Sequence, residues 1–280
     1  MSEKVRVLIA SGILSPMHDG RSVNKMLAKT LEASEHFTVD ISEESRGLNL
    51  EAFNGYELVL INYDGIVAES VTDRASLAAG RSRAVPLGAV TENALYDYVN
   101  QGGGVIFYHS SVLVGGRFSE KYRSLIGCVN APDKYQPYRD TGYTVDVNKA
   151  CGHTITEGVE EHWKLCDDDF FNSIELDNDC EIIASIYDPL NKRDVPVMWV
   201  KQVGKGRVFS VTLGHQQDTI RRLDFVRLII RAADWAAHGV VTVPMPDRDS
   251  GVNWMKSWPW YFCPSCGREN WVSLGNMLRF

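Results

Sequence analysis

Three glycines followed by four large apolar residues constrain the fold of this chain more than any other segment. Residues 102–104 end a polar-flanked helical segment at 91–100, because glycine leaves helical geometry at negligible steric cost. Residues 105–108, Val-Ile-Phe-Tyr, have the composition of a strand buried on both faces. The strand stops at His109. Since ligands of open α/β sheets bind beyond the carboxyl ends of the strands, His109 is the first candidate site residue.

Other apolar segments predict an open sheet around this strand. A strand at 5–10 is followed by a loop that contains His18, a helix from about Ser22, and strands at 37–41 and 57–63. Strand, helix, strand and strand, each followed by a polar loop, is the pattern of a right-handed parallel α/β sheet. The later part of the chain predicts strands at 143–147, 180–187, 195–201 and 207–213, the last two joined by a glycine-bearing hairpin, and a helix at 219–238.

The acidic composition excludes several kinds of partner. A formal net charge of -7 argues against a surface for nucleic acid or anionic membrane, because both need clustered cations. No run reaches the roughly 18 apolar residues of a membrane span, and residues 1–4 lead straight into a strand. We therefore expect a cytoplasmic protein with one α/β domain at 1–242 and an extension at 243–280, and a small-molecule partner.

The extension differs from the rest of the chain in composition. It contains four of the seven tryptophans and the motif Cys263-Pro-Ser-Cys266. Two thiolates at this spacing can bind one zinc ion, but a complete site needs two more ligands, from elsewhere in the chain or from a second subunit. The alternative is a pair of free thiols on a tail that packs through its tryptophans. Because exposed aromatic side chains suit an interface, we expect a homodimer or a larger homo-oligomer.

Two predicted strands lead directly into a histidine. His109 follows the strand at 105–108, and His215 follows the strand at 207–213 after one glycine. Neutral imidazole binds divalent metals and titrates near neutrality. We expect a shared site in which His109, His215 and Asp168 or Asp169 perform acid–base chemistry or hold a divalent ion. The alternatives are that each histidine only hydrogen-bonds a loop and that these aspartates are solvated.

Polar side chains near the same predicted edge are candidates for substrate binding. Ser110 lies beside His109 but lacks the flanking glycines of a G-x-S-x-G elbow, which argues against a serine hydrolase. The glycines at 102–104 precede their strand instead of following it, so no nucleotide cofactor is expected. For His153 the alternative is that it fixes a turn. The candidates are His18, Tyr63, Asp64, Ser110, Arg117, Tyr122 and His153.

The ordered motifs of residues 5–239 resemble those of the ThuA-like (trehalose utilisation) family, a branch of the class I glutamine amidotransferase-like fold. The resemblance is carried by GGGVIFYHSS, FSEKYRSLIGC, CGHTITEG, DDDFFNS, VPVMWVKQVGKGRVFSVTLGHQQD and ADWAAHG. It implies a flavodoxin-like, mainly parallel sheet flanked by helices, here with a Trp- and Cys-rich C-terminal extension. It also places His109 near the position that the catalytic cysteine occupies in an amidotransferase. Because this chain has no cysteine there, hydrolysis of glutamine through a Cys-His pair is not expected.

The resemblance further implies a role in carbohydrate metabolism, with disaccharides and their keto derivatives as the substrate class. Where the family usually reads Asp-Glu-Leu-Tyr, this chain has Asp168-Asp169-Phe170-Phe171. From the resemblance and the candidate His and Asp residues, we expect a sugar hydrolase, isomerase or lyase that uses these side chains. The alternative is a non-catalytic carbohydrate-binding or assembly protein, which the two phenylalanines and the tryptophan-rich tail would suit.

Overall fold

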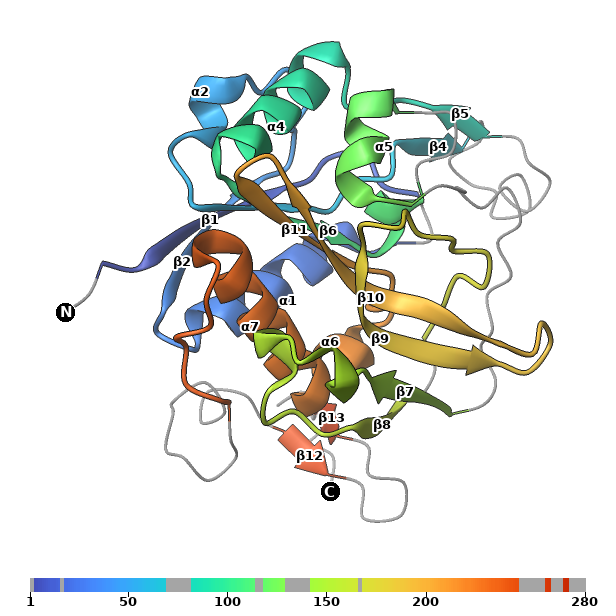
Figure 1. Cartoon of the computed structure of the whole chain (residues 1–280). Helices are drawn as coiled ribbons and strands as arrows, with labels where there is room; N and C mark the ends of the chain where they lie inside the picture. The colour runs from blue at the N-terminus through green and yellow to red at the C-terminus, as the bar shows by residue number, and fades with distance from the viewer. Residues whose placement is uncertain are drawn as a thin grey trace, which may run out of the picture.

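A nine-stranded sheet in the order β2-β1-β3-β6-β11-β10-β9-β7-β8 organises the part of the chain that the structure describes (Figure 1). The structure is a computed structural model, and it describes residues 3–15, 18–68, 82–113, 118–128, 142–165, 168–246, 260–262 and 269–271. The strands of this sheet are β1 (Val5–Ala10), β2 (Phe37–Ser42), β3 (Leu58–Ile61), β6 (Gly104–Tyr108), β7 (Tyr143–Val147), β8 (His162–Leu165), β9 (Glu181–Asp188), β10 (Arg193–Val203) and β11 (Gly206–Val211).

The sheet has a parallel half and an antiparallel half. From β2 through β1, β3 and β6 to β11, every neighbouring pair is parallel. From β11 onward through β10, β9, β7 and β8, every pair is antiparallel. The carboxyl ends of β1, β3, β6 and β11 therefore meet at one edge, as the flavodoxin-like prediction requires.

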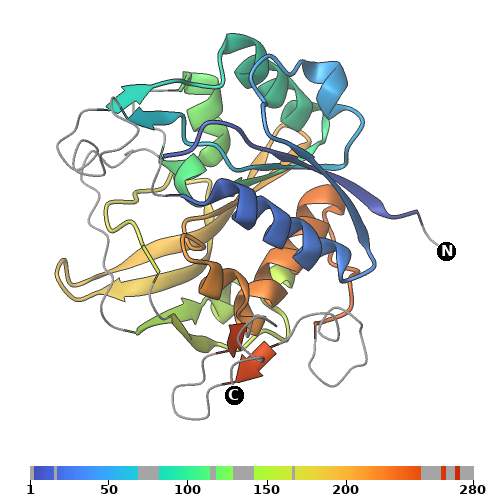
Figure 2. The same ribbon diagram turned by 180° about the vertical axis from the view of Figure 1, so that it is seen from behind.

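Helices cover both faces of the sheet. On one face, α7 (Leu223–His238) packs on β6 and β11, beside α1 (Gly20–Glu32) and the short α6 (Gln217–Ile220) (Figures 1 and 2). On the other face, α4 (Ala89–Gln101) and α5 (Glu120–Ile126) contact β11, and α2 (Leu50–Phe53) lies against α4. The 3₁₀ turns η1 (His109–Val112), η3 (Lys149–Cys151) and η4 (Thr154–Thr156) lie in the connections.

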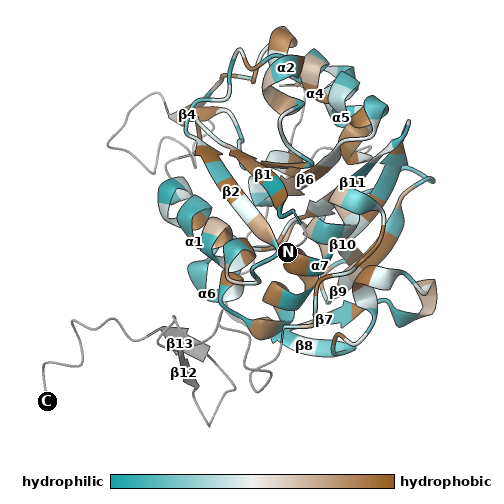
Figure 3. Ribbon diagram, turned by 90° about the vertical axis from the view of Figure 1, so that its left-hand side faces the viewer, coloured by the Kyte–Doolittle hydropathy of each residue, from teal (hydrophilic) through white to brown (hydrophobic). Residues whose placement is uncertain are grey.

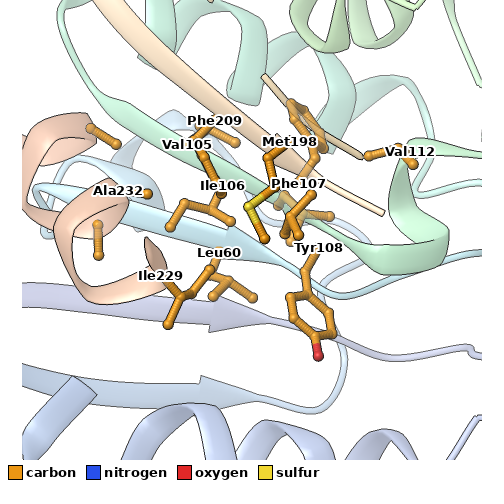
Figure 4. Packing of buried hydrophobic residues seen from close by; sticks show 14 of the residues in the cluster. Leu60, Val105, Ile106, Phe107, Tyr108, Val112, Met198, Phe209, Ile229 and Ala232 are labelled. Carbon is orange, nitrogen blue, oxygen red and sulfur yellow. The ribbon is translucent and has the colours of Figure 1, made fainter. Parts of the chain in front are cut away.

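The core lies on both faces of the central strands. In Figure 4, Ile106 and Leu60 lie toward Ile229 and Ala232 of α7, and all four are fully buried or nearly so. Figure 3 shows the hydrophobic residues gathered on the central strands, whereas α1 turns mainly hydrophilic residues outward. All five residues of β6 are buried, which explains why its sequence is uniformly apolar instead of alternating.

The structure corrects several predicted boundaries. Helix α1 begins at Gly20, not near Ser22, because the side chain of Asp19 caps it by accepting from the backbone N–H of Ser22. The helix predicted at 219–238 is interrupted at Arg221 and Arg222, which separate α6 from α7. Strand β8 was missed, because its four residues are too short to give a clear alternation.

Two other short hairpins complete the described chain. Strands β4 (Ile66–Ala68) and β5 (Ser82–Ala84) pair antiparallel, as do β12 (Trp260–Phe262) and β13 (Glu269–Trp271). Cys263 and Cys266 lie outside the described residues, as does Arg117. The domain boundary at residue 242 stays a prediction. Among the described helices, none has the length and apolar character needed to span a membrane.

Candidate active site at the carboxyl edge of the sheet

Three histidines from separate strand ends meet at the carboxyl edge of the parallel half. His18 follows β1, His109 follows β6 and His215 follows β11. The ring centroid of His18 lies 5.0 Å from the centroid of His109 and 5.0 Å from that of His215. The centroids of His109 and His215 are 5.1 Å apart. One ligand nitrogen from each ring lies within 4.8 Å of the other two, so the three residues could hold one metal ion.

The backbone of His109 has an unusual conformation. Its φ is +47°, in the left-handed region that residues with a side chain rarely occupy. The strand β6 ends at Tyr108, and this turn starts η1. A strained residue persists only where its surroundings fix it, and such residues cluster at functional sites. The conformation of His109 is therefore a second indication of function, beside its position at the end of β6.

The hydrogen bonds of His109 determine its tautomer. Its Nδ1 lies 2.6 Å from the carbonyl oxygen of Thr212, which can only accept, so Nδ1 carries the proton. Burial lowers the pKa of His109 well below 6.5, and the neighbouring His18 and His215 lower it further. The ring is therefore neutral at physiological pH. Its Nε2 presents an unprotonated lone pair to the cluster, 3.1 Å from the Nδ1 of His215.

A buried carboxylate orients His18. Nδ1 of His18 lies 2.8 Å from Oδ2 of Asp64, whose side chain is fully buried. The same carboxylate accepts from the backbone N–H groups of Ser15 and Ile66. Asp64 therefore fixes the loop after β1 and leaves Nε2 of His18 as the nitrogen available to a ligand. A carboxylate behind an imidazole is the usual second partner of a metal-binding histidine.

His215 lies between two acceptors. Its Nδ1 is 3.1 Å from Nε2 of His109 and 3.3 Å from Oδ2 of Asp169. Because both neighbouring atoms offer lone pairs, the proton of His215 lies on Nδ1 in this arrangement. Asp169 is fully buried, so it brings a carboxylate directly to the cluster. Of the two aspartates proposed from the sequence, Asp169 is the one that contacts the histidines.

Asp168 instead holds the loop that carries His215. Its carboxylate accepts from the backbone N–H groups of Gly214 (2.8 Å), Gln216 (3.1 Å) and Asp169 (2.9 Å). Burial raises the pKa of Asp168 to about 7. The three N–H groups favour the charged carboxylate and so oppose part of this increase in the pKa. Asp168 is therefore a positioning residue: it fixes the backbone on both sides of His215.

Tyr108 and Gly214 complete this support. The hydroxyl of Tyr108 donates to the carbonyl oxygen of Gly214 at 2.7 Å. Gly214 has φ +102°, and a Cβ there would lie 2.0 Å from the Tyr108 hydroxyl oxygen. The glycine is required both by its conformation and by this close approach. The buried hydroxyl of Tyr108, the last residue of β6, thus holds the loop after β11 in position.

Phe171 forms an apolar wall beside the cluster. Its ring centroid lies 5.3 Å from that of His109, with an angle of 31° between the planes. Phe170 and Phe171 are both buried, and Phe170 packs on Tyr143. Two of the three residues that depart from the family pattern, Phe170 and Phe171, therefore contribute packing here, and Phe171 lowers the polarity around His109.

Three other candidates lie in the packing around the site. The hydroxyl of Tyr63 donates to the carbonyl oxygen of Val85 at 2.7 Å, and burial raises the pKa of Tyr63 to about 12. The buried ring of Tyr122 stacks on Phe118 at 4.4 Å. Ser110 is buried beside His109, and its hydroxyl has no hydrogen-bond partner within the described residues.

His153 lies apart from the three-histidine cluster. Its Nδ1 accepts from the backbone N–H of Ile155, and its ring packs on Trp235 of α7 at 4.9 Å. These contacts suit the alternative interpretation that His153 fixes a turn. Local sequence patterns do not reveal the contact of His109 with the carbonyl oxygen of Thr212 or the supporting role of Gly214. A glycine between an apolar strand and a histidine was the available signal for Gly214.

Comparisons with known proteins agree with this fold. The fold is similar to that of a putative ThuA-like protein from Parabacteroides merdae ATCC 43184, with a TM-score of 0.69 and 20% identity over 88% of this chain and 94% of that one. A putative ThuA-like protein from Bacteroides uniformis ATCC 8492 gives a TM-score of 0.62 and 14% identity, covering 85% and 93%.

A β-galactosidase from Bacillus circulans sp. alkalophilus contains a similar fold in part of its length. The TM-score is 0.53 with 13% identity, over 87% of this chain and 32% of that one. A search of curated proteins finds no match. The family model described as "Trehalose utilisation" matches residues 6–236, which includes every strand of the nine-stranded sheet apart from the first residue of β1. The chain therefore belongs to the ThuA family.

Proposed function

We propose that this protein is an enzyme of sugar metabolism that binds a divalent metal ion at His18, His109 and His215 and transforms a sugar or keto-sugar derivative there. The observation that carries the proposal is the unprotonated Nε2 of His109, which is buried and faces the other two imidazoles. A lone pair in that position can bind a metal ion or take a proton.

The hydrogen bonds behind the rings support a metal ion. Nδ1 of His18 is held by Asp64, and Nδ1 of His109 is held by the carbonyl oxygen of Thr212. Metal-binding histidines usually donate their second N–H to a carboxylate or backbone carbonyl in this way. Three histidines and an open position are the ligand set of several catalytic zinc sites. A bound ion of this kind supplies a Lewis acid for a carbonyl or hydroxyl oxygen.

Asp169 supports acid–base chemistry at the same place. Its carboxylate Oδ2 lies 3.3 Å from Nδ1 of His215, so the pair can share or move one proton. Sugars react through hydroxyl and carbonyl groups, which need a base to remove a proton and an acid to return it. We assign this exchange to Asp169, with His215 orienting its carboxylate through Nδ1 and with Asp168, Tyr108 and Gly214 as positioning residues.

The substrate class follows from the family and not from the geometry. The family is described by trehalose utilisation, which makes a disaccharide or its oxidised derivative the first compound class to test. Hydrolysis, isomerisation and elimination all use the same groups. Product analysis decides among them.

Metal analysis followed by a substrate panel tests the proposal. Purified protein is stripped with a chelator, reloaded with Zn²⁺, Mn²⁺ or Co²⁺, and incubated with disaccharides and their keto derivatives while products are followed by mass spectrometry. We expect turnover only after reloading, and a loss of at least a hundredfold in His109→Asn. Asparagine is chosen because it tolerates a positive φ better than most residues.

His162→Asn is the matched control. His162 is exposed on β8, and its Nδ1 pairs with Asp146 at 2.7 Å, away from the cluster. We expect its turnover to equal that of the wild type. Sugar binding by calorimetry without product in any metal-loaded sample would support the non-catalytic alternative, which the apolar Phe171 beside His109 also favours. Equal turnover in wild type and His109→Asn would contradict the enzyme assignment of His109.

A further inference from the structure

A second group of metal-ligating side chains lies at the opposite edge of the sheet. His36 immediately precedes β2, and His238 is the last residue of α7. Because β1 and β2 are parallel, the amino end of β2 lies across the sheet from the carboxyl end of β1, which leads to His18. His36, His238 and Asp234 offer three ligand atoms within 4.8 Å of one another. None of them belongs to the cluster of His18, His109 and His215.

The two carboxylate oxygens of Asp234 have different partners. Its Oδ2 accepts from the backbone N–H groups of Thr242 and Val243, and from the hydroxyl of Thr242. Its Oδ1 lies 3.1 Å from Nε2 of His36 and 3.1 Å from Nδ1 of His238. Asp234 is fully buried, whereas the side chains of His36 and His238 are 23% and 40% exposed. One oxygen is thus anchored by the protein, and the other faces two imidazoles that solvent can reach.

We infer that His36, Asp234 and His238 form a second divalent-metal site, selective for zinc-like ions. Two imidazole nitrogens and one carboxylate oxygen are a known zinc ligand set, with water in the remaining position. With bonds of about 2.1 Å, ligand atoms 3.1 Å apart correspond to an angle of about 95° at the ion, which lies within the range for four- and five-coordinate zinc. The anchored Oδ2 is the second contact that metal-binding carboxylates usually have.

An ion at this site would join three parts of the chain. His36 lies between α1 and β2, Asp234 and His238 belong to the last turns of α7, and Oδ2 of Asp234 holds residues 242–243. Helices α1 and α7 lie side by side on one face of the sheet (Figure 2). The site would therefore fix the end of α7 to the edge of the sheet at the point where the chain leads into residues 243–280. We assign it a structural role.

Hydrogen bonding of the buried Asp234 by two imidazoles is the simpler explanation that the experiment must exclude. In that case the histidines would need protons on the nitrogens that face Oδ1, and zinc would bind no tighter than to a surface histidine. Metal binding would release those protons and couple the ion to folding. The two explanations therefore differ in zinc stoichiometry and in the effect of zinc on the melting temperature.

The test uses the full chain with the other candidate metal sites removed. The background protein carries His109→Asn, Cys263→Ser and Cys266→Ser, and Zn²⁺ is titrated against a competing chelator dye. We expect one equivalent of zinc per chain. Adding His238→Gln should weaken this binding at least tenfold, and adding His36→Gln as well should abolish it, whereas adding His162→Gln should change nothing.

Thermal unfolding provides a second readout. Zinc at about a hundred times its dissociation constant should raise the melting temperature of the background protein by about 5 °C or more and leave the His36→Gln/His238→Gln form unchanged. If that double variant does not fold, the exposed His238→Gln form is used, and its zinc-induced shift should be smaller. Background protein that binds no zinc, or zinc binding that survives both substitutions, overturns the inference. Failure of the active-site proposal would instead appear in the sugar panel.

Discussion

Nδ1 of His109 lies 2.6 Å from the carbonyl oxygen of Thr212, a residue 103 positions later in the sequence. This contact joins the ends of two neighbouring parallel strands, β6 and β11, and fixes which nitrogen of the imidazole carries the proton. With Nδ1 occupied, Nε2 faces His18 and His215 as an acceptor. The chemical character of the site depends on this hydrogen bond.

The buried, neutral state of His109 predicts a pH dependence of stability. Its pKa in the folded protein is well below 6.5, so below about pH 6.5 the unfolded chain binds a proton at this residue and the folded chain does not. The free energy of unfolding in EDTA should therefore decrease as the pH falls below 6.5, by up to about 1.4 kcal/mol per pH unit from this group. Urea unfolding of the wild type and His109→Asn between pH 7 and 5 measures it. A slope that is equal in both proteins would show that His109 titrates normally.

Replacing Asp64 should disturb His18 without removing it. Asp64→Asn substitutes an amide that cannot serve all the donors that the carboxylate accepts, among them Nδ1 of His18 and the backbone N–H of Ser15. We expect metal affinity to fall by about 10- to 100-fold, as is usual when the carboxylate behind a metal-binding imidazole is lost. Isothermal titration with Co²⁺ gives the affinity. Asp146→Asn, which removes the partner of the exposed His162, is the control and should bind as the wild type does.

Gly214 should be intolerant of a methyl group. A Cβ would lie 2.0 Å from the Tyr108 hydroxyl oxygen, in addition to the cost of a positive φ. Gly214→Ala should therefore lower the free energy of unfolding by about 2–4 kcal/mol, from backbone strain and overpacking together. Gly47→Ala isolates the first effect, because Gly47 has φ +87° and a Cβ there would meet nothing within 4 Å. The free energy of unfolding of both variants is measured in urea. Equal decreases in the two variants would show that the Tyr108 side chain moves aside without lowering the stability.

Asp168 should act on the loop after β11 more than on the chemistry. Asp168→Asn places an amide where the backbone N–H groups of Gly214, Gln216 and Asp169 converge, and its NH₂ group cannot accept from them. We expect a loss of about 1–3 kcal/mol in the free energy of unfolding, since a buried donor remains unpaired. Amide hydrogen exchange at residues 214–216 should increase in the same variant. Unchanged exchange there would contradict the positioning role.

Local sequence patterns predicted the central part of this fold well. The run of residues 105–108 became β6, and the apolar run of residues 5–10 matches β1 at both ends, because buried parallel strands need continuous apolar residues. The strand-then-histidine pattern likewise indicated that His109 and His215 share an edge of the sheet. Buried, uniformly apolar strands are predictable because their own residues determine burial.

Contacts between distant residues could not be predicted in this way. Asp64 was expected to bind substrate, but only the fold shows that it accepts from His18. Helical periodicity in the segment 219–238 places Arg231 and Asp234 on the polar side of the predicted helix, yet both are buried, because Arg231 donates to the carbonyl oxygen of Ile155 and Asp234 accepts from residues 242–243. Each partner lies in another part of the chain, so helical periodicity alone assigned these side chains to the wrong environment.

The most direct test of the three-histidine site is the visible absorption spectrum of the Co²⁺-loaded protein, recorded on a Cys263→Ser/Cys266→Ser/His36→Gln/His238→Gln background that removes the other candidate metal sites. We predict the d–d bands of one bound ion per chain, loss of those bands in His109→Asn, and their retention in the control His162→Asn. Bands of equal intensity in the His109→Asn protein, or none in the background protein, would contradict a metal site built on Nε2 of His109.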